Sequence, residues 1–201
     1  MLLLGIDIGT SSIKASVVDG ATGQLVASAQ YPDTENTISS PYPDWAEQDP
    51  EMWWDCAVNA IKRCNDSGKY NPKDIQAIGI AYQMHGLVLI DENLNPVRSS
   101  IIWCDSRAAA IGNEIYDRMG HEYCQQQILG SPGNFTASKL KWVQTNQPEI
   151  FEKAYNDYWK KLNAFSYTMT QDKDLAQNIV QDVFIDLWER KDDLSINAIE
   201  P

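Results

Sequence analysis

The residues whose types and spacing best suit chemistry lie near the start of the chain. A run of apolar residues carries Asp7 and ends at Gly9. Three small residues with hydroxyl groups follow before a second apolar run begins: Thr10, Ser11 and Ser12. Glycine lets the backbone approach a ligand, hydroxyl and N–H groups can donate to phosphate oxygens, and the carboxylate of Asp7 can hold a hydrated magnesium ion. The alternative is an ordinary hairpin with a Gly-Thr turn.

Three short strands would hold this polar tip in place. Apolar runs over 3–8 and 13–18 flank the tip, and a third run covers 25–30 after a Gly-rich turn. Such runs separated by turn residues predict an antiparallel meander, which begins a sheet.

A helix is predicted after a polar loop. Residues 31–50 are rich in Pro, Ser and Asp, and Asp49 is suited to cap a helix whose first position is Pro50. Over 52–64, apolar residues recur at intervals of three and four, which is typical of an amphipathic helix.

Polar residues follow two later apolar runs, at the points where strands would end. The run over 75–82 leads into Gln83, Met84 and His85, and a further strand is expected over 87–90. For His85, a hydrogen bond within the fold is the alternative to a ligand contact.

The second of these runs, over 101–103, repeats the arrangement. It leads into Asp105 and Arg107, after which helices are predicted over 108–119 and 137–144. Polar residues gathered at the ends of several strands mark a ligand crevice. For Arg107, pairing with a neighbouring carboxylate is an equally good interpretation.

The composition limits the class of protein. The chain has 201 residues, 43% of them hydrophobic and 22% charged, which is typical of a soluble globular protein. Its net charge is -12, and acidic residues outnumber basic ones on both sides of residue 152, so a broad nucleic-acid-binding face is not expected. Neither a signal peptide nor a membrane span is predicted, and a cytoplasmic location is expected. The four cysteines lack metal-site or disulfide spacing, so free thiols are expected.

The order of the motifs resembles that of the FGGY carbohydrate kinases, and within that family that of the xylulokinases. The motifs are Asp-x-Gly-Thr at 7–10, Trp-Ala-Glu-Gln-Asp-Pro at 45–50, Gln-Met-His-Gly at 83–86, Trp-Cys-Asp-Ser-Arg at 103–107 and Pro-Gly-Asn-Phe-Thr-Ala at 132–137. This resemblance spans about residues 1–152. It implies a truncated ribonuclease-H-like (actin-like) α/β lobe with a mixed sheet flanked by helices. It also implies ATP- and Mg²⁺-dependent phosphorylation of a ketose, with D-xylulose as the expected sugar.

The resemblance also assigns site residues. It implies that His85 and Asp105 hydrogen-bond sugar hydroxyls and that Trp103 lies beside the sugar, as polar acceptors and an apolar platform would suit. Gln83 and Met84 belong to the same substrate motif. The resemblance makes Asp7 the catalytic and metal-binding carboxylate, and it gives phosphate binding to the turn at 9–12.

Catalysis by the chain alone is not expected. The family's catalytic aspartate lies in a Gly-Gly-Gly-Asp-Asn-like stretch and its adenosine site in a second lobe, and neither has a match in this sequence.

Residues 153–201 are predicted to form a separate helical segment. Apolar residues recur at helical spacing over 175–188. This stretch resembles region two of extracytoplasmic-function sigma factors through six residues: Asp174, Ala176, Gln181, Asp182, Phe184 and Trp188. A plain amphipathic helix is the alternative.

The sigma-factor resemblance implies a second function. It implies that this helix docks on core RNA polymerase through Gln181, Asp182 and Asp186, with no DNA-reading part present. The join near residue 152 is interpreted as a chimera, natural or made, or as a gene-model artefact. A folded hybrid without function is the third interpretation, and an oligomer is left open.

Overall fold

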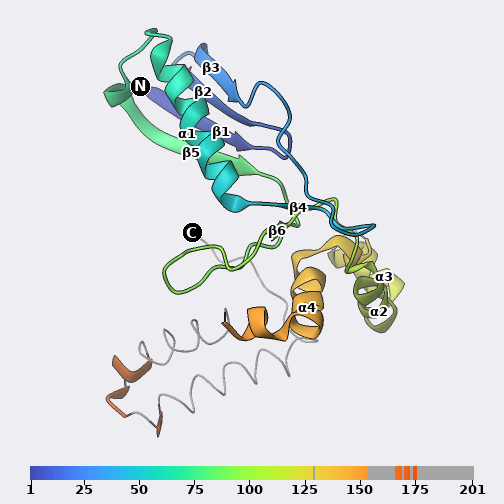
Figure 1. Ribbon diagram of the computed structural model, residues 1–201. Coiled ribbons are helices and arrows are strands. Elements are labelled where there is room, and N and C mark those ends of the chain that lie inside the picture. The colour runs from blue at the N-terminus through green and yellow to red at the C-terminus, as the bar shows by residue number, and fades with distance from the viewer. Residues whose placement is uncertain (129, 154–165, 169, 173, 176–201) are drawn as a thin grey trace.

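The computed structural model describes residues 1–128, 130–153, 166–168, 170–172 and 174–175 (Figure 1). Within them, a four-stranded sheet and a long helix form one part of the molecule, and a group of shorter helices forms the other. Most of the predicted segment over 153–201 lies outside the described residues, so its separate helical structure stays a prediction.

The sheet contains the predicted meander and one further strand. Strands β1 (Leu2–Ile8), β2 (Ile13–Asp19) and β3 (Leu25–Tyr31) are antiparallel, and β5 (Ile75–Tyr82) pairs with β1 in parallel. The order is therefore β3-β2-β1-β5. A sheet of this mixed kind confirms the predicted α/β class.

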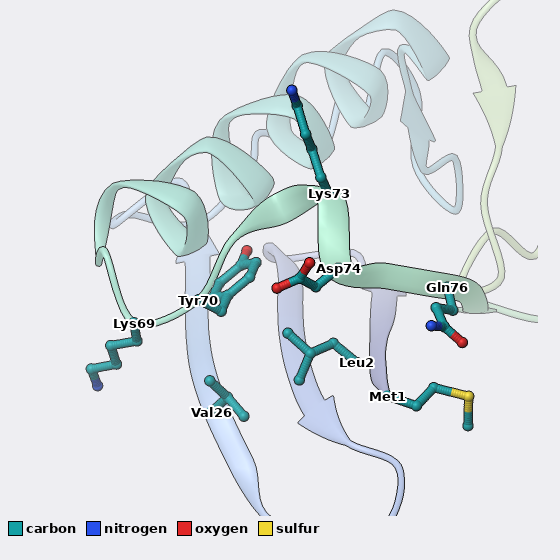
Figure 2. Close-up of a pocket in the computed structure, with 8 residues that line it drawn as sticks. All are labelled: Met1, Leu2, Val26, Lys69, Tyr70, Lys73, Asp74 and Gln76. Atoms are coloured by element: carbon teal, nitrogen blue, oxygen red, sulfur yellow. The ribbon is translucent and has the colours of Figure 1, made fainter.

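The end of the sheet where β1 begins carries an open surface pocket of about 580 Å³ (Figure 2). Leu2, Val26 and Tyr70 lie near its centre, and Lys69 and Lys73 point in different directions away from them. Because this end of β1 is opposite to the polar tip, the pocket is separate from the predicted site.

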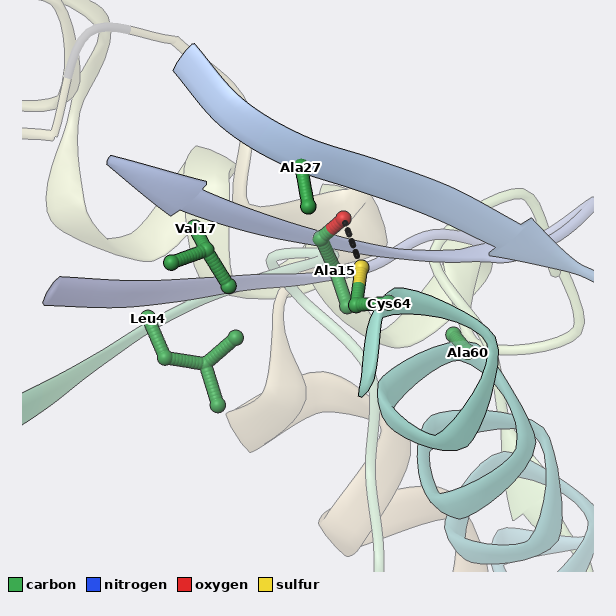
Figure 3. Packing of buried hydrophobic residues seen from close by; sticks show 6 residues of the cluster. All are labelled: Leu4, Ala15, Val17, Ala27, Ala60 and Cys64. Carbon is green, nitrogen blue, oxygen red and sulfur yellow. Dashed lines mark hydrogen bonds between the residues drawn. The ribbon is translucent and has the colours of Figure 1, made fainter. Parts of the chain in front are cut away.

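Helix α1 (Pro50–Asp66) covers one face of the sheet and begins as predicted. The Asp49 side chain accepts a hydrogen bond from the Glu51 amide at 3.0 Å, and Pro50 is the first helical residue. The buried residues of α1 at its interface with the sheet are small: Cys56, Ala57, Ala60 and Cys64. The Cys64 thiol donates to the Ala15 carbonyl at 3.3 Å (Figure 3). Small residues let the helix lie close to the strands, which fixes the meander that carries the tip.

The strand predicted over 87–90 was wrong, and the run predicted over 101–103 is a strand only at its start. Residues over 87–90 make only isolated bridges, and β6 (Ser100–Ile101) pairs with β4 (Glu47–Gln48) in a separate two-stranded sheet. The chain turns immediately after β6, because the Asp105 amide donates to the Ile102 carbonyl at 3.1 Å. The 103–107 motif therefore follows a short connector and not a strand of the main sheet.

The remaining elements are short helices. They are the 3₁₀ turns η1 (Pro72–Asp74) and η2 (Pro132–Asn134) and the α-helices α2 (Ala109–Met119), α3 (His121–Gln127) and α4 (Thr136–Asn146). The sequence pattern predicts α2 and α4 to within two residues at each end. It does not predict α3, which is rich in glutamine and has no apolar periodicity. No helix in the described ranges is both long and apolar enough to cross a membrane.

A contact between two glycines joins α2 to η2. A Cβ atom added to Gly112 would lie 2.1 Å from the Cα atom of Gly133, which is backbone and cannot turn aside. We expect Gly112→Ala to lower the free energy of unfolding by about 3 kcal/mol, because α2 and η2 must separate. Urea denaturation followed by tryptophan fluorescence measures this loss. Gly79→Ala is the control, since a Cβ atom there meets nothing within 4 Å; an equal loss in both variants would contradict the prediction.

Candidate functional site

The site begins where two parallel strands end at the same edge of the sheet. Ile8 of β1 lies in register with Tyr82 of β5, and the amide of Gln83 donates to the Ile8 carbonyl at 3.3 Å. The turn at 9–12 and the segment at 83–86 therefore leave the sheet side by side. This is the juxtaposition that the sequence predicts for a crevice.

The turn at 9–12 is tight and is held by its neighbours. A Cβ atom on Gly9 would lie 2.9 Å from the Ser12 carbonyl oxygen, so only glycine fits the turn. The backbone N–H of Asn36 donates to the Ser11 carbonyl at 2.7 Å, and Gln48 Nε2 donates to the Thr10 carbonyl at 2.9 Å. These contacts fix the backbone, while the residue types of the turn remain suited to phosphate oxygens.

Asp7 projects from β1 on the face opposite to α1. It is exposed, and it lies opposite Lys14 in the antiparallel register. Among the described residues, no group of three or more His, Cys, Asp or Glu side chains is placed to hold a metal ion. One carboxylate beside a phosphate turn nonetheless fits Mg²⁺, which usually keeps several waters and binds through one or two carboxylates plus phosphate oxygens.

Trp103 is bonded directly to the turn at 9–12. Its indole Nε1 donates to Thr10 Oγ1 at 2.9 Å, and its carbonyl accepts a hydrogen bond from Asn134 Nδ2. Thr10 Oγ1 in turn lies 3.1 Å from Gln83 Oε1, to which it donates. Because Trp103 is 48% exposed, part of the indole remains open beside the turn as an apolar platform.

His85 lies in a strained segment of backbone, and residues at the start of α4 hold this segment in place. Its backbone is left-handed, with φ of 63°, and its ring stacks on Phe135 with centroids 4.8 Å apart. Lys139 Nζ donates to the His85 carbonyl at 2.8 Å, and Thr136 Oγ1 donates to the Gly86 carbonyl at 3.0 Å. These contacts leave the imidazole exposed at the site.

Lys139 is the functional residue that the sequence analysis missed. It is fully buried, and Nζ also donates to the Asn134 carbonyl at 3.1 Å. Burial lowers its pKa to about 8, with nearby Asp105 opposing and Arg107 reinforcing the shift. The signal that could have found it is its spacing, because it lies four residues before the buried Val143 on α4.

Asp105 lies beneath the site and is 1% exposed. Its carboxylate accepts a hydrogen bond from the backbone N–H of Ala46 at 2.6 Å. It is also bidentate to Arg107, whose Nε donates to Oδ1 at 2.9 Å and whose Nη2 donates to Oδ2 at 2.6 Å. The interpretation of Arg107 as the partner of a neighbouring carboxylate is thus confirmed. A direct contact between Asp105 and a sugar stays a prediction, because the described contacts occupy the carboxylate.

The ion pair of Asp105 and Arg107 extends into a larger buried cluster. Arg107 Nη2 lies 2.7 Å from Glu47, which also pairs with Arg98. The Arg107 guanidinium stacks 3.7 Å from the ring centroid of Trp45. Desolvation lowers the pKa of Arg98, and Glu47 opposes that shift. The cluster fixes the 103–107 loop from below.

Of the remaining predicted site residues, the structure describes Met84 but not those predicted to bind polymerase. Met84 is 68% exposed at the end of β5, beside His85. The predicted polymerase-binding residues Gln181, Asp182 and Asp186 lie outside the described residues.

Comparison with known proteins identifies the class. The family model for the N-terminal domain of the FGGY family of carbohydrate kinases matches residues 2–183. The chain therefore belongs to the FGGY family of carbohydrate kinases, and its actin-like fold is that of the family's N-terminal domain.

The chain is similar to several xylulose kinases. The chain is 39% identical to the xylulose kinase of Escherichia coli K12 over 153 residues, covering 76% of this chain and 30% of that protein. The structure resembles a xyloylose kinase from Brucella ovis with a TM-score of 0.68 and 32% identity, covering 77% of this chain and 31% of that one. It also resembles a Plasmodium falciparum glycerol kinase solved with ADP, with a TM-score of 0.65 and 25% identity, covering 76% and 30%.

The chain spans about three tenths of the length of the relatives it matches first. The family match also runs past residue 152 to residue 183. It therefore enters the segment that the sequence analysis interpreted as a sigma-factor region. None of these findings supports a sigma-factor or chimeric origin for that segment.

Proposed function

We propose that this domain forms the sugar-binding part of a kinase that transfers phosphate from MgATP to a ketose, with D-xylulose as the substrate. The observation that carries the proposal is the hydrogen bond between Trp103 and Thr10. It joins a half-exposed aromatic platform to the turn suited to phosphate. Phosphoryl transfer depends on holding the acceptor hydroxyl in line with the phosphate, so the two sites must adjoin.

Each residue of the site has a role in this proposal. Trp103 offers its apolar face to the sugar ring, and His85 hydrogen-bonds a sugar hydroxyl. Gln83 and Met84 line the same side of the site. Asp105 supports the site through Arg107.

The phosphate side of the site uses the turn after β1. Gly9 allows close approach, and the N–H and hydroxyl groups of Thr10, Ser11 and Ser12 are the donors. Asp7 would hold a hydrated magnesium ion beside the turn. When bound, MgATP supplies the phosphoryl group, and its metal ion offsets the negative charge that the group carries.

The proposal predicts weak, specific sugar binding. The chain has two histidines, His85 and His121, so histidine labelling gives one signal at the site and one internal control at the start of α3. We expect D-xylulose to shift the NMR signal of His85 but not that of His121. The affinity should be in the millimolar range, because a few neutral hydrogen bonds contribute about 0.5–1.5 kcal/mol each.

His85→Ala should weaken D-xylulose binding about tenfold, measured through the indole signal of Trp103. His121→Ala is the matched control and should bind the sugar like the unmodified chain. Shifts of both histidines together, or equal affinity of the His85→Ala variant, would contradict the assignment of the sugar site.

Three expectations remain predictions. They are the inactivity of a polypeptide of these 201 residues alone, the cytoplasmic location and the binding of core RNA polymerase by the C-terminal segment. No observation on the described residues favours polymerase binding as a second function.

A further inference from the structure

The hydroxyl of Thr10 lies between two side chains of the sugar site. Trp103 Nε1 is 2.9 Å from Thr10 Oγ1, and Gln83 Oε1 is 3.1 Å from the same oxygen. An indole N–H can only donate, so it always occupies one lone pair of this hydroxyl. The remaining lone pair and the single proton must serve both Gln83 and any phosphate at the turn.

In the observed arrangement the proton is used within the protein. Thr10 donates to Gln83 Oε1, so its hydroxyl has no second proton for a phosphate oxygen. Gln83 Nε2 is meanwhile buried and has no hydrogen-bond partner among the described residues. A buried amide nitrogen without a partner is uncommon and costs stability.

Rotation of the Gln83 side-chain amide by half a turn changes which group receives the hydroxyl proton of Thr10. The two ends of the amide have nearly the same shape, so the rotated form occupies the same space. Nε2 would then donate to Thr10 Oγ1, which would accept from both Gln83 and Trp103. The Thr10 proton would be released toward the turn, where a phosphate oxygen could accept it.

We propose that Gln83 is a positioning residue whose amide rotates when phosphate binds, and that Thr10 thereby couples phosphate binding to the sugar platform. This proposal rests on the function proposed above and names a regulation of the same site. A hydroxyl that donates to an anion is a stronger acceptor, so phosphate at the turn strengthens the bond from Trp103. The indole is then held more firmly where the sugar lies, and each ligand favours the other.

The rest of the surroundings supports a local change. Gln48 Nε2 holds the Thr10 carbonyl at 2.9 Å, and the Gln83 amide N–H holds the Ile8 carbonyl at 3.3 Å. Because these backbone contacts do not involve the Thr10 hydroxyl or the Gln83 side-chain amide, they can persist in both arrangements. Only side-chain hydrogen bonds need to change.

The experiment measures D-xylulose affinity with and without magnesium tripolyphosphate, which supplies phosphate groups without adenosine. The readout is the indole N–H signal of Trp103 in the full chain, assigned by its loss in Trp103→Phe. We expect tripolyphosphate to move this signal downfield and to raise sugar affinity about fivefold. Thr10→Val keeps the branched shape but lacks the hydroxyl. In this variant the ratio of sugar affinity with tripolyphosphate to that without it should fall to about one. Thr10→Ser, which keeps the hydroxyl, should retain it.

The outcomes separate the proposed coupling through Thr10 and Gln83, here called the relay, from the proposed function of the site. If the unmodified chain binds both ligands and Thr10→Val shows the same fivefold ratio, the relay is wrong and the proposed function stands. If the unmodified chain binds neither ligand, both proposals fail. Gln83→Met removes the amide that takes the Thr10 proton, so tripolyphosphate should bind this variant at least as tightly as the unmodified chain. Weaker tripolyphosphate binding would overturn the competition between Gln83 and phosphate.

Discussion

Arg107→Met is expected to lower the free energy of unfolding by about 3–5 kcal/mol, which is the usual cost of removing one partner of a buried ion pair. The Arg107 side chain is 1% exposed and that of its partner Asp105 is 0% exposed. Without the guanidinium, the Asp105 carboxylate stays buried with only backbone donors. The stacking on Trp45 is lost as well. Urea denaturation at neutral pH measures the difference.

The chain offers a matched control for this variant. Arg63 and Asp33 also form an arginine–aspartate pair with two short hydrogen bonds, but their side chains are 39% and 77% exposed. Arg63→Met should therefore cost only a small part of what Arg107→Met costs, because solvent screens the exposed pair. Equal losses in the two variants would show that burial does not control the strength of the Arg107 pair.

A double variant tests the reason for the loss. Asp105→Asn combined with Arg107→Met removes the unpaired charge while keeping an acceptor for the Ala46 amide. We expect it to be more stable than Arg107→Met alone, since the buried charge is the main cost. A further loss in the double variant would contradict this explanation.

Local patterns in the sequence predicted the elements that carry the phosphate turn. The meander depends on alternating apolar runs and turns, and the start of α1 depends on Asp49 and Pro50, so neighbouring residues decide both. The crevice between the turn and the segment at 83–86 was also predictable, because parallel strands β1 and β5 end at one edge.

Long-range contacts decided what the sequence did not show. Asp105 is buried because the Ala46 amide, 59 residues earlier, and Arg107 surround its carboxylate, and no periodicity reveals such a partner. The bond from Trp103 to Thr10 joins residues 93 positions apart. Lys139 was missed for a different reason, because a lysine on a short helix is ordinarily expected to face solvent.

Lys139 should make the free energy of unfolding rise with pH above about pH 8. Its pKa is lowered from 10.5 to about 8 in the folded chain, mainly because the ammonium is buried. Between these two values the unfolded chain binds a proton that the folded chain does not. The contribution of Lys139 to the free energy of unfolding therefore rises with pH across this window, by about 2–3 kcal/mol in total, and is flat below pH 8.

The two hydrogen bonds of Lys139 can survive the loss of its charge. A neutral amine still has two N–H groups, which matches the two acceptors, the carbonyls of His85 and Asn134. Lys139→Met removes the amine while keeping an unbranched side chain of similar length. We expect the unmodified chain to gain about 2–3 kcal/mol in free energy of unfolding relative to this variant between pH 7 and pH 10, measured by urea denaturation at each pH.

Taking the difference between the two proteins cancels the titration of all other groups. A difference that does not change with pH would therefore show that the buried amine does not lose its proton in this range. A difference that falls as pH rises would show that the folded chain favours the charged form, so that an ammonium group still holds the His85 segment above pH 8.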